Sequence, residues 1–243
     1  HGVNFEGMTG ALQKSPAGAI VVLHACCHNP TGVDLSPAQW ERVLEIVNSR
    51  GLVPLLDFAY QGFAEGLDAD AAPVRRFTEA CPAVFVSSSF SKSLSLYGER
   101  VGALSIVTES ADEAARVLSQ VKRVIRTNYS NPPTHGGQAA AMVLGTPELR
   151  ALWESELGQM RDRIKVMRRE LVAKVRAIRA DFDLSFVIQQ RGMFSYSGLS
   201  KEQVQRLRQE YSVYAIDSGR ICVAALNSKN IDYAARAIAS VLV

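Results

Sequence analysis

Side chains that could do chemistry on an amine or a carbonyl group gather in three short segments of this 243-residue sequence. The first is Asn29-Pro30-Thr31-Gly32, the second holds Asp57 and Tyr60, and the third is Ser87–Lys92, with Arg100 eight positions after the lysine. Together the three segments supply an amide, a carboxylate, a phenol, hydroxyls, a guanidinium and an amine, and a lysine amine can act as a nucleophile or as a base. Taken singly, these residues could be a turn, a helix cap and surface charges. Their combination favours a site.

Each of these segments comes directly after a predicted strand. The strands, at 19–26, 52–57 and 83–88, are short apolar runs. The helix between the first two begins at the N-cap Ser36, has Pro37 at its first position and ends at Gly51. Strands that alternate with helices predict a parallel α/β sheet covered on both faces. Ligands bind at the carboxyl ends of such strands, so we expect the three segments to share one crevice.

The rest of the sequence has a different order of elements. Helices are predicted over 111–126, 135–144 and 147–180. Short strands at 186–189, 193–196 and 221–224 follow, with helices over 200–211 and from 231 onward. This order is typical of an α+β unit. We therefore expect a boundary inside the long helix, with one domain at 1–160 and a smaller one at 161–243.

Composition and charge exclude several classes of protein. The formal net charge of +3 is too small to indicate a nucleic-acid partner, and the basic residues of the long helix are interpreted as a solvated face rather than a nucleic-acid contact. No apolar run approaches the ~20 residues of a membrane span, and no signal peptide or metal-ligand spacing appears. The four cysteines are interpreted as reduced, mostly buried thiols, which predicts a cytoplasmic protein.

Six segments of the chain, taken in order, resemble the aspartate and aromatic amino acid aminotransferases of class I, fold type I. They are HNPTG, DFAYQGFA, SFSKSLSLYGERVG, RTNYSNPP, RGMFSYSGL and GRICVAALN. The resemblance runs over essentially the whole chain, and the Ser-x-x-Lys…Arg segment is its most diagnostic part. It implies part of a parallel-rich large domain that binds pyridoxal phosphate, followed by a smaller α+β C-terminal domain. The variants CCHNPTG, QQRGMFSYSGLS and CVAALN are more similar to the aromatic (tyrosine) enzymes than to the strict aspartate ones.

The resemblance implies a role for each residue around the cofactor, pyridoxal 5′-phosphate. Lys92 would form the Schiff base and then move a proton from the substrate Cα to the cofactor C4′. Asp57 would face the pyridine nitrogen and keep it protonated, so that the ring accepts electrons. The phenolic oxygen of the ring would accept hydrogen bonds from Asn29 and Tyr60. Ser89 and Arg100 would bind the phosphate group.

The resemblance also implies substrate contacts. Arg220 matches the clamp for the α-carboxylate, and Arg126 matches the arginine that binds a distal carboxylate across a homodimer interface. Phe194 would line the pocket, with Asn29 beside the substrate. Surface ion pairs are the structural alternative for both arginines, and a plain core position is the alternative for Phe194. The substrates would be an aromatic or acidic amino acid and a 2-oxo acid such as 2-oxoglutarate.

The large domain of the family begins well before this chain does, and the sequence has no initiator methionine. We therefore expect a C-terminal portion of such an enzyme with little activity by itself. Three hypotheses follow: a transaminase, a non-catalytic fragment that folds and self-associates without productive cofactor binding, and a Schiff-base aldolase that uses Lys92 without pyridoxal phosphate. The aldolase is disfavoured because it would need neither Asp57 nor Arg100.

Overall fold

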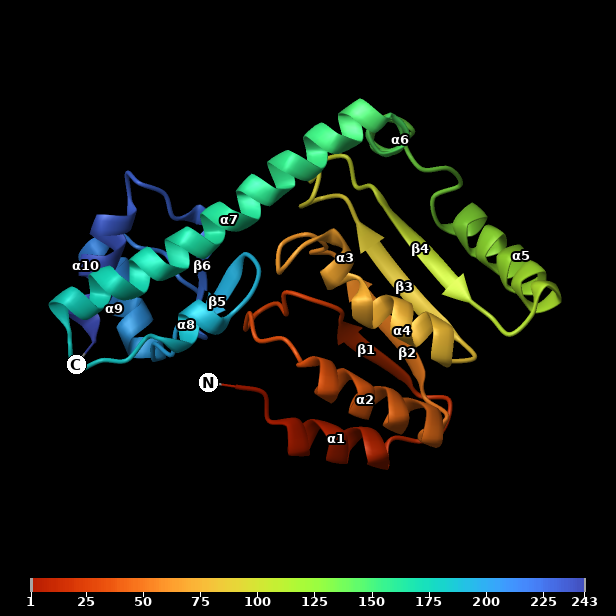
Figure 1. The fold of residues 1–243 in the computed structure, drawn as a ribbon, viewed down its shortest axis with the longest axis horizontal. Helices are drawn as coiled ribbons and strands as arrows, with labels where there is room; N and C mark the ends of the chain where they lie inside the picture. Colours follow the sequence, from red (N-terminus) through yellow and green to blue (C-terminus); the bar gives the residue numbers. More distant parts are fainter. Residues whose placement is uncertain (1, 243) are drawn as a thin grey trace.

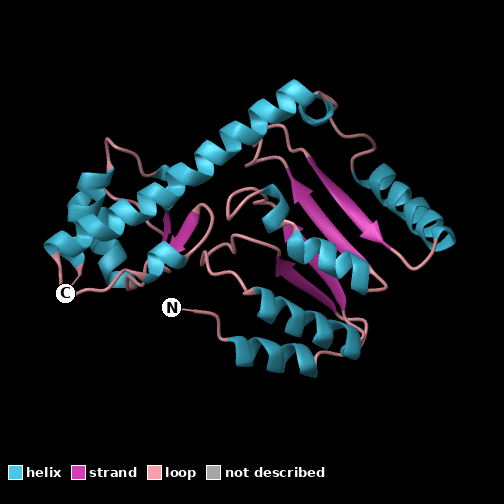
Figure 2. Cartoon of the chain, viewed as in Figure 1, coloured by secondary structure: helices cyan, strands magenta, loops and turns pink. Residues whose placement is uncertain are grey.

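A computed structural model describes residues 2–242 of the chain. It contains a four-stranded sheet with its helices and a smaller unit built on a two-stranded sheet, and the long helix α7 (Pro147–Ile178) runs from one to the other (Figures 1 and 2). Because α7 is continuous through residue 160, no break in secondary structure marks the proposed domain boundary. That boundary stays a prediction.

The large sheet has the strand order β1-β2-β3-β4. Strands β1 (Ile20–His24), β2 (Val53–Phe58) and β3 (Val84–Ser89) are parallel, which confirms the predicted arrangement for these three. Strand β4 (Gly102–Val107) pairs antiparallel with β3 and was not predicted. The segment between β3 and β4 contains no helix to carry the chain back across the sheet, so the chain returns antiparallel beside β3. This return places Lys92 and Arg100 in one connection at the end of β3.

Helices cover one face of this sheet, where α2 (Pro37–Arg50) and α4 (Ala72–Ala80) lie side by side (Figure 1). As predicted, Ser36 caps α2 in a capping box and Gly51 ends it in the left-handed conformation. Trp40 of α2 packs edge-on against Phe77 of α4, with 5.7 Å between ring centroids. Helix α1 (Phe5–Lys14) packs on α2, and α3 (Leu67–Asp70) precedes α4. Neither α1 nor α4 was predicted from the sequence.

The other face of the sheet is uncovered, contrary to the expectation that both faces are buried. Ile20 and Val22 of β1 are each 62% exposed, and Leu104 of β4 is 55% exposed. Helix α5 (Ala111–Asn128) lies beyond β4 and has no buried residue (Figure 1). Helix α6 (His135–Gly145) then leads into α7. These three helices match the predicted ranges within two residues at each end.

The smaller unit confirms most of its predicted elements. Strands β5 (Phe194–Tyr196) and β6 (Arg220–Cys222) pair antiparallel, and η1 (Val223–Ala225) follows β6 directly. Helices α9 (Lys201–Tyr211) and α10 (Ile231–Val241) pack together, and α10 also packs on α7. The predicted strand at 186–189 is wrong, because this segment is the short helix α8 (Phe186–Gln189). Over only four residues, the spacing of apolar side chains cannot distinguish the helical period of about 3.6 residues from the strand period of about two.

Candidate active site

The loop after β1 is shaped by a single carboxylate. Asp34 accepts hydrogen bonds from the backbone N–H groups of Cys27 and His28, each at 2.8 Å. These bonds turn the chain back on itself and bring Asn29 to the carboxyl end of β2. There the Asn29 side-chain amide donates to the Tyr60 hydroxyl at 3.4 Å. The structure thus brings together the first two of the three predicted segments.

The loop that follows Tyr60 is held in the same way by a buried carboxylate. Asp70 is 4% exposed and accepts four backbone N–H groups of residues 62–66, at 2.8, 3.1, 2.8 and 3.3 Å. A buried carboxylate satisfied by this many donors fixes the loop rigidly. Asp57, at the end of β2, accepts from the backbone N–H of Ala59 at 3.1 Å. Tyr60 is therefore anchored on both sides.

Lys92 lies directly against Tyr60. Its Nζ is 4.5 Å from the centroid of the Tyr60 ring, within the range of a cation–π contact. Within residues 2–242, no carboxylate forms a salt bridge with this ammonium group. The connection that carries Lys92 is pinned from α7, where the Trp153 indole N–H donates to the carbonyl of Ser93 at 2.7 Å. The lysine is thus a positioned amine without an ion-pair partner.

The smaller unit contributes the other wall of the site. Arg220, the first residue of β6, donates through Nη1 to the Asn29 side-chain oxygen at 2.9 Å. Its guanidinium carbon lies 4.5 Å from the ring centroid of Phe194 on β5. The Phe194 ring meets the Tyr60 ring edge-on, with 6.5 Å between centroids. Residues that are far apart in the sequence therefore form one cluster: Asn29, Tyr60, Lys92, Phe194 and Arg220.

Gly32 lets the two units approach closely at this point. Its φ of +71° lies in the left-handed region, and a Cβ at this position would lie 2.7 Å from the backbone oxygen of Phe194. Any larger residue would therefore push β5 away from the Asn29 loop. The buried Arg168 of α7 donates to the backbone oxygens of Gly192 and Phe194, both at 2.7 Å. Burial lowers the pKa of this guanidinium to about 10, so it remains charged at neutral pH.

The electrostatics of the site favour neutral hydrogen-bonding groups beside the lysine. Burial raises the pKa of the Tyr60 phenol, although the hydrogen bond from Asn29 opposes the shift. Tyr60 therefore keeps its proton at neutral pH. Burial and the neighbouring His24 ring lower the pKa of His28, whose Nδ1 lies 2.7 Å from the Thr31 hydroxyl oxygen. His28 is therefore a neutral imidazole at neutral pH.

Four of the predicted residues lie outside this contact cluster: Asp57, described above at the end of β2, and three others. Ser89 pairs with Gly102 across β3 and β4, and its hydroxyl accepts the N–H of Ser91 at 3.2 Å. Arg100 is exposed, with φ +54°, and donates to the carbonyl of Tyr97 at 3.0 Å. Arg126, in the last turn of α5, is exposed and donates to the Ser130 hydroxyl. Ser89 and Arg100 border the Lys92 connection, whereas no contact joins Arg126 to the cluster.

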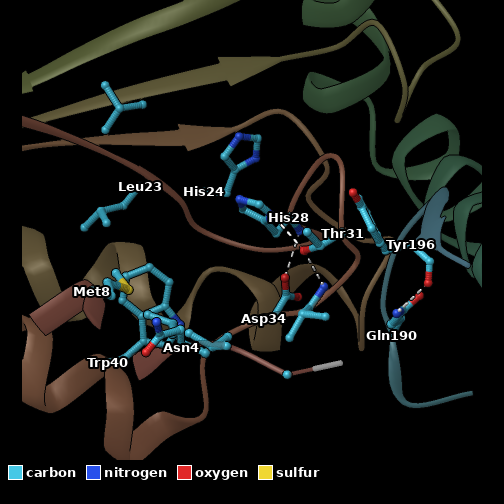
Figure 3. A pocket seen from close by; sticks show the side chains of 15 residues that line it. Asn4, Met8, Leu23, His24, His28, Thr31, Asp34, Trp40, Gln190 and Tyr196 are labelled. Atoms are coloured by element: carbon cyan, nitrogen blue, oxygen red, sulfur yellow. Dashed lines mark hydrogen bonds between the residues drawn. The ribbon is translucent and has the colours of Figure 1, made fainter. Parts of the chain in front are cut away.

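A cavity of about 420 Å³ opens beside the cluster, between the end of β1, the segment before α1 and the turn that precedes β5 (Figure 3). Its walls are mainly apolar, with Met8, Leu23 and Trp40 on one side and the edge-on pair His24 and His28 on the other (Figure 3). His24 is also the register partner of Asp57 across β1 and β2. The lining includes neither Lys92 nor Asp57. Within residues 2–242, no cluster of His, Cys, Asp and Glu could hold a metal ion.

The supporting carboxylates Asp34 and Asp70 and the buried Arg168 were missed by the sequence analysis. Nothing in their local sequence distinguishes them from surface charges, because the groups they bind, mostly backbone atoms, are brought near by the fold. The interpretation of the basic residues of the long helix as a solvated face is therefore wrong for Arg168, which is 2% exposed and also donates to the Ser195 hydroxyl. The cysteines were interpreted correctly: all four are free, and only Cys222 is exposed. Within the described part of the chain, no helix has the length and apolar character of a membrane span.

Comparison with known proteins now gives the family. The family model of aminotransferase class I and II matches residues 1–238. The chain belongs to this aminotransferase family. It is 62% identical over 242 residues to an aspartate aminotransferase of Pseudomonas aeruginosa, and 49% identical over 242 residues to an aromatic-amino-acid aminotransferase of Escherichia coli. Each alignment covers 100% of this chain and 61% of the relative.

The fold is that of the same family. A crystal structure of an aromatic-amino-acid aminotransferase from Burkholderia pseudomallei, covalently bound to pyridoxal phosphate, superposes with a TM-score of 0.98 at 66% identity. That match covers 100% of this aminotransferase chain and 61% of the other. The chain therefore spans about three fifths of the length of these relatives. Relatives of both the aspartate and the aromatic kind match it closely.

Proposed function

We propose that this chain provides the lysine-bearing part of a pyridoxal-phosphate-dependent transaminase. The reaction transfers the amino group of an aromatic or acidic amino acid to 2-oxoglutarate. The observation that carries the proposal is the position of Lys92 within the cluster that joins Asn29 to Arg220. Its amine lies against the Tyr60 ring and forms no salt bridge with any residue that the structure describes. A nucleophilic amine needs such a setting of neutral donors and few competing carboxylates.

The donor set at the strand ends fits pyridoxal phosphate. The cofactor, when bound, supplies an electron-accepting ring for the chemistry at the substrate Cα. Lys92 would hold the cofactor covalently and move a proton between the substrate Cα and the cofactor C4′. Asp57 provides a carboxylate for the pyridine nitrogen, and the amide of Asn29 with the neutral phenol of Tyr60 provides donors for the phenolic oxygen. This assignment uses Tyr60 as a neutral phenol, the protonation state that its raised pKa supports.

Phosphate binding is assigned to Ser89 and Arg100. Both border the connection that carries Lys92. Arg100 is exposed, and among residues 2–242 only its Nη1 forms a hydrogen bond, to the Tyr97 carbonyl. A guanidinium with free donors can form the paired hydrogen bonds that a phosphate accepts. Its exposure lets it turn toward a bound phosphate group without breaking a buried contact.

Substrate binding is assigned to Arg220, Arg126 and Phe194. Arg220 would bind the α-carboxylate, and its present bond to the neutral Asn29 amide can be exchanged for a stronger bond to a carboxylate. The Phe194 ring stacks on the Arg220 guanidinium and would line the pocket. Arg126, which contacts nothing in the cluster, would act across a homodimer interface.

The free cysteines support a cytoplasmic location.

A second candidate is a non-catalytic fragment that folds and self-associates without productive cofactor binding. It is favoured by the uncovered face of the large sheet, where Ile20 and Val22 are each 62% exposed. It is also consistent with a chain that spans 61% of its relatives. The two candidates differ in one property, namely whether Lys92 reacts with the cofactor.

The test is covalent labelling of the purified chain. Pyridoxal phosphate is added, the mixture is reduced with borohydride, and the labelled peptides are mapped. The transaminase proposal predicts one dominant label on Lys92, lost in Lys92→Ala and retained in a control variant of the exposed Lys122 of α5, Lys122→Ala. A label spread over surface lysines in equal amounts, or one that survives Lys92→Ala, would contradict the proposal and favour the non-catalytic fragment.

A further inference from the structure

We propose that Glu65 is a positioning residue that ties the Tyr60 loop to the turn leading into Phe194 and so sets the spacing between the two walls of the site. Its effect on substrate binding rests on the proposed function. The tie itself is a property of the chain and can be measured without any ligand.

Glu65 binds a different cation with each carboxylate oxygen. Oε2 accepts a hydrogen bond from the Lys165 ammonium of α7 at 2.7 Å, and Oε1 lies 2.6 Å from Nε of Arg191, which precedes β5. The side chain therefore joins three segments that are remote in sequence: the loop after β2, α7 and the turn before β5. An exposed single ion pair contributes little, but a carboxylate shared by two cations restricts both.

Both ends of this tie are fixed to backbone at the site. The N–H of Glu65 donates to the buried Asp70 carboxylate at 2.8 Å, within the loop that begins at Tyr60. The N–H of Arg191 donates to the carbonyl of Gly32 at 2.6 Å, at the end of the Asn29 loop. A shift of Arg191 would therefore move the Asn29 loop and the start of β5 together. The ion pair between Glu65 and Arg191 therefore affects the positions of three cluster residues: Asn29, Tyr60 and Phe194.

Charge balance explains why a carboxylate is needed at this position. A small cavity of about 200 Å³ between the Tyr60 loop, α7 and the turn before β5 is lined by four cationic side chains, and Glu65 is the sole acidic residue among its described lining residues. The four are Lys165, Arg168, Arg169 and Arg191. Without Glu65, Arg191 and Lys165 would repel each other and the buried Arg168 across this gap. The turn before β5 would then relax away from α7.

The experiment compares hydrogen exchange in the unliganded chain and in three variants. E65Q keeps the shape of the side chain but removes the charge, and Arg191→Gln breaks the same pair from the other side. E154Q removes an exposed carboxylate of α7 that pairs with Arg150, and it is the matched control because Glu154 is 42% exposed and Glu65 is 49% exposed. We expect the backbone amide of residue 191 to exchange about tenfold faster in E65Q and in Arg191→Gln than in the wild type. In E154Q its exchange rate should be unchanged.

Equal exchange at residue 191 in E65Q and the wild type would overturn the proposal, as would an equal increase in E154Q. A parallel measurement separates this outcome from a failure of the proposed function. With pyridoxal phosphate bound, E65Q should bind succinate several-fold more weakly than the wild type, and E65D should recover part of the affinity. If the wild type takes up no cofactor on Lys92, the proposed function fails while the exchange result still decides the role of Glu65.

Discussion

At the scale of single residues, Tyr60 is where the parts of the site meet. Its hydroxyl accepts from Asn29, its ring lies against the Lys92 ammonium, and the same ring makes a T-shaped contact with Phe194 of the smaller unit. The raised pKa of the phenol keeps the proton on the oxygen, so the group can donate to a ligand while the amide donates beside it. A single side chain thus determines both the geometry and the polarity around the lysine.

Removing this hydroxyl should weaken cofactor binding more than it weakens the fold. Tyr60→Phe loses one hydrogen bond to Asn29, whose amide oxygen still accepts from Arg220, so the free energy of unfolding should fall by only about 1 kcal/mol. The dissociation constant for pyridoxal phosphate should rise by about fivefold or more, since the bound phenolic oxygen loses a donor. Urea unfolding measures the free energy of unfolding, and an absorbance titration with pyridoxal phosphate measures the dissociation constant. Tyr214→Phe, at a position 78% exposed, is the control and should change neither.

Asn29, Tyr60 and Lys92 were predicted from their positions after strands, whereas Phe194 and Arg220 were predicted from the resemblance to a known family; the role of each residue stays a prediction. Asn29, Tyr60, Lys92, Phe194 and Arg220 are brought into contact by the fold. The supporting residues could not be predicted, because their function depends on backbone groups from other segments. Asp70 is the clearest case. Its four backbone N–H donors lie in the preceding loop, and they surround the carboxylate only when that loop is folded.

At the scale of elements, strong local signals were predicted correctly and context-dependent ones were not. Helix α2 carries its own cap at Ser36 and its own stop at Gly51, and the structure has both where predicted. Strand β4 depends on pairing with β3, and α8 is a four-residue segment whose backbone is fixed by contacts with α7. One such contact comes from Arg168 of α7, which donates to the Val187 carbonyl at 3.1 Å. This bond stabilises the segment as the short helix α8 instead of a strand.

The ion pairs between elements should make stability depend on pH in a defined direction. The hydrogen bond from Lys165, with the charge of Arg191, holds the pKa of Glu65 below its ordinary value of 4.5. A carboxyl group whose folded-state pKa is lowered stabilises the fold above its unfolded-state pKa, and this contribution disappears as the pH falls through the folded-state pKa. The wild type should therefore be more stable than E65Q at pH 7, by about 1 kcal/mol or less because the group is half exposed.

Denaturant unfolding of both proteins at several pH values measures this difference. It should stay constant from neutral pH down to roughly pH 5 and shrink toward zero at lower pH, as the carboxylate is protonated. A difference that grew on acidification would mean that Glu65 is not stabilised as a carboxylate. Such a result would also remove the electrostatic basis for the positioning role of Glu65.

At the scale of the whole molecule, the large sheet is covered on one face only. Helices α2 and α4 lie on one side (Figure 1). On the other side, β1 presents Ile20 and Val22 to solvent and β4 presents Leu104. Contiguous exposed apolar surface favours association. We expect the purified chain to self-associate through this face.

A pair of valine substitutions tests this expectation. Val22→Thr should reduce self-association in sedimentation velocity experiments and change the free energy of unfolding by less than about 0.5 kcal/mol, because the side chain is 62% exposed. Val43→Thr, at a position of 0% exposure in α2, makes the same chemical change in the core. It should cost about 1–3 kcal/mol and leave the association of the folded fraction unchanged. Unaltered association of Val22→Thr would show that the chains meet elsewhere.

The central claim is that the strand ends and the smaller unit together form a pyridoxal-phosphate site around Lys92. A crystal structure of the chain grown with pyridoxal phosphate tests it most directly. We predict continuous electron density from Lys92 Nζ to the cofactor, with Asp57 at the pyridine nitrogen, Asn29 and Tyr60 at the phenolic oxygen, and Arg100 turned toward the phosphate. Cofactor bound at another lysine, or seated in the cavity beside His24 with Lys92 unmodified, would contradict the account.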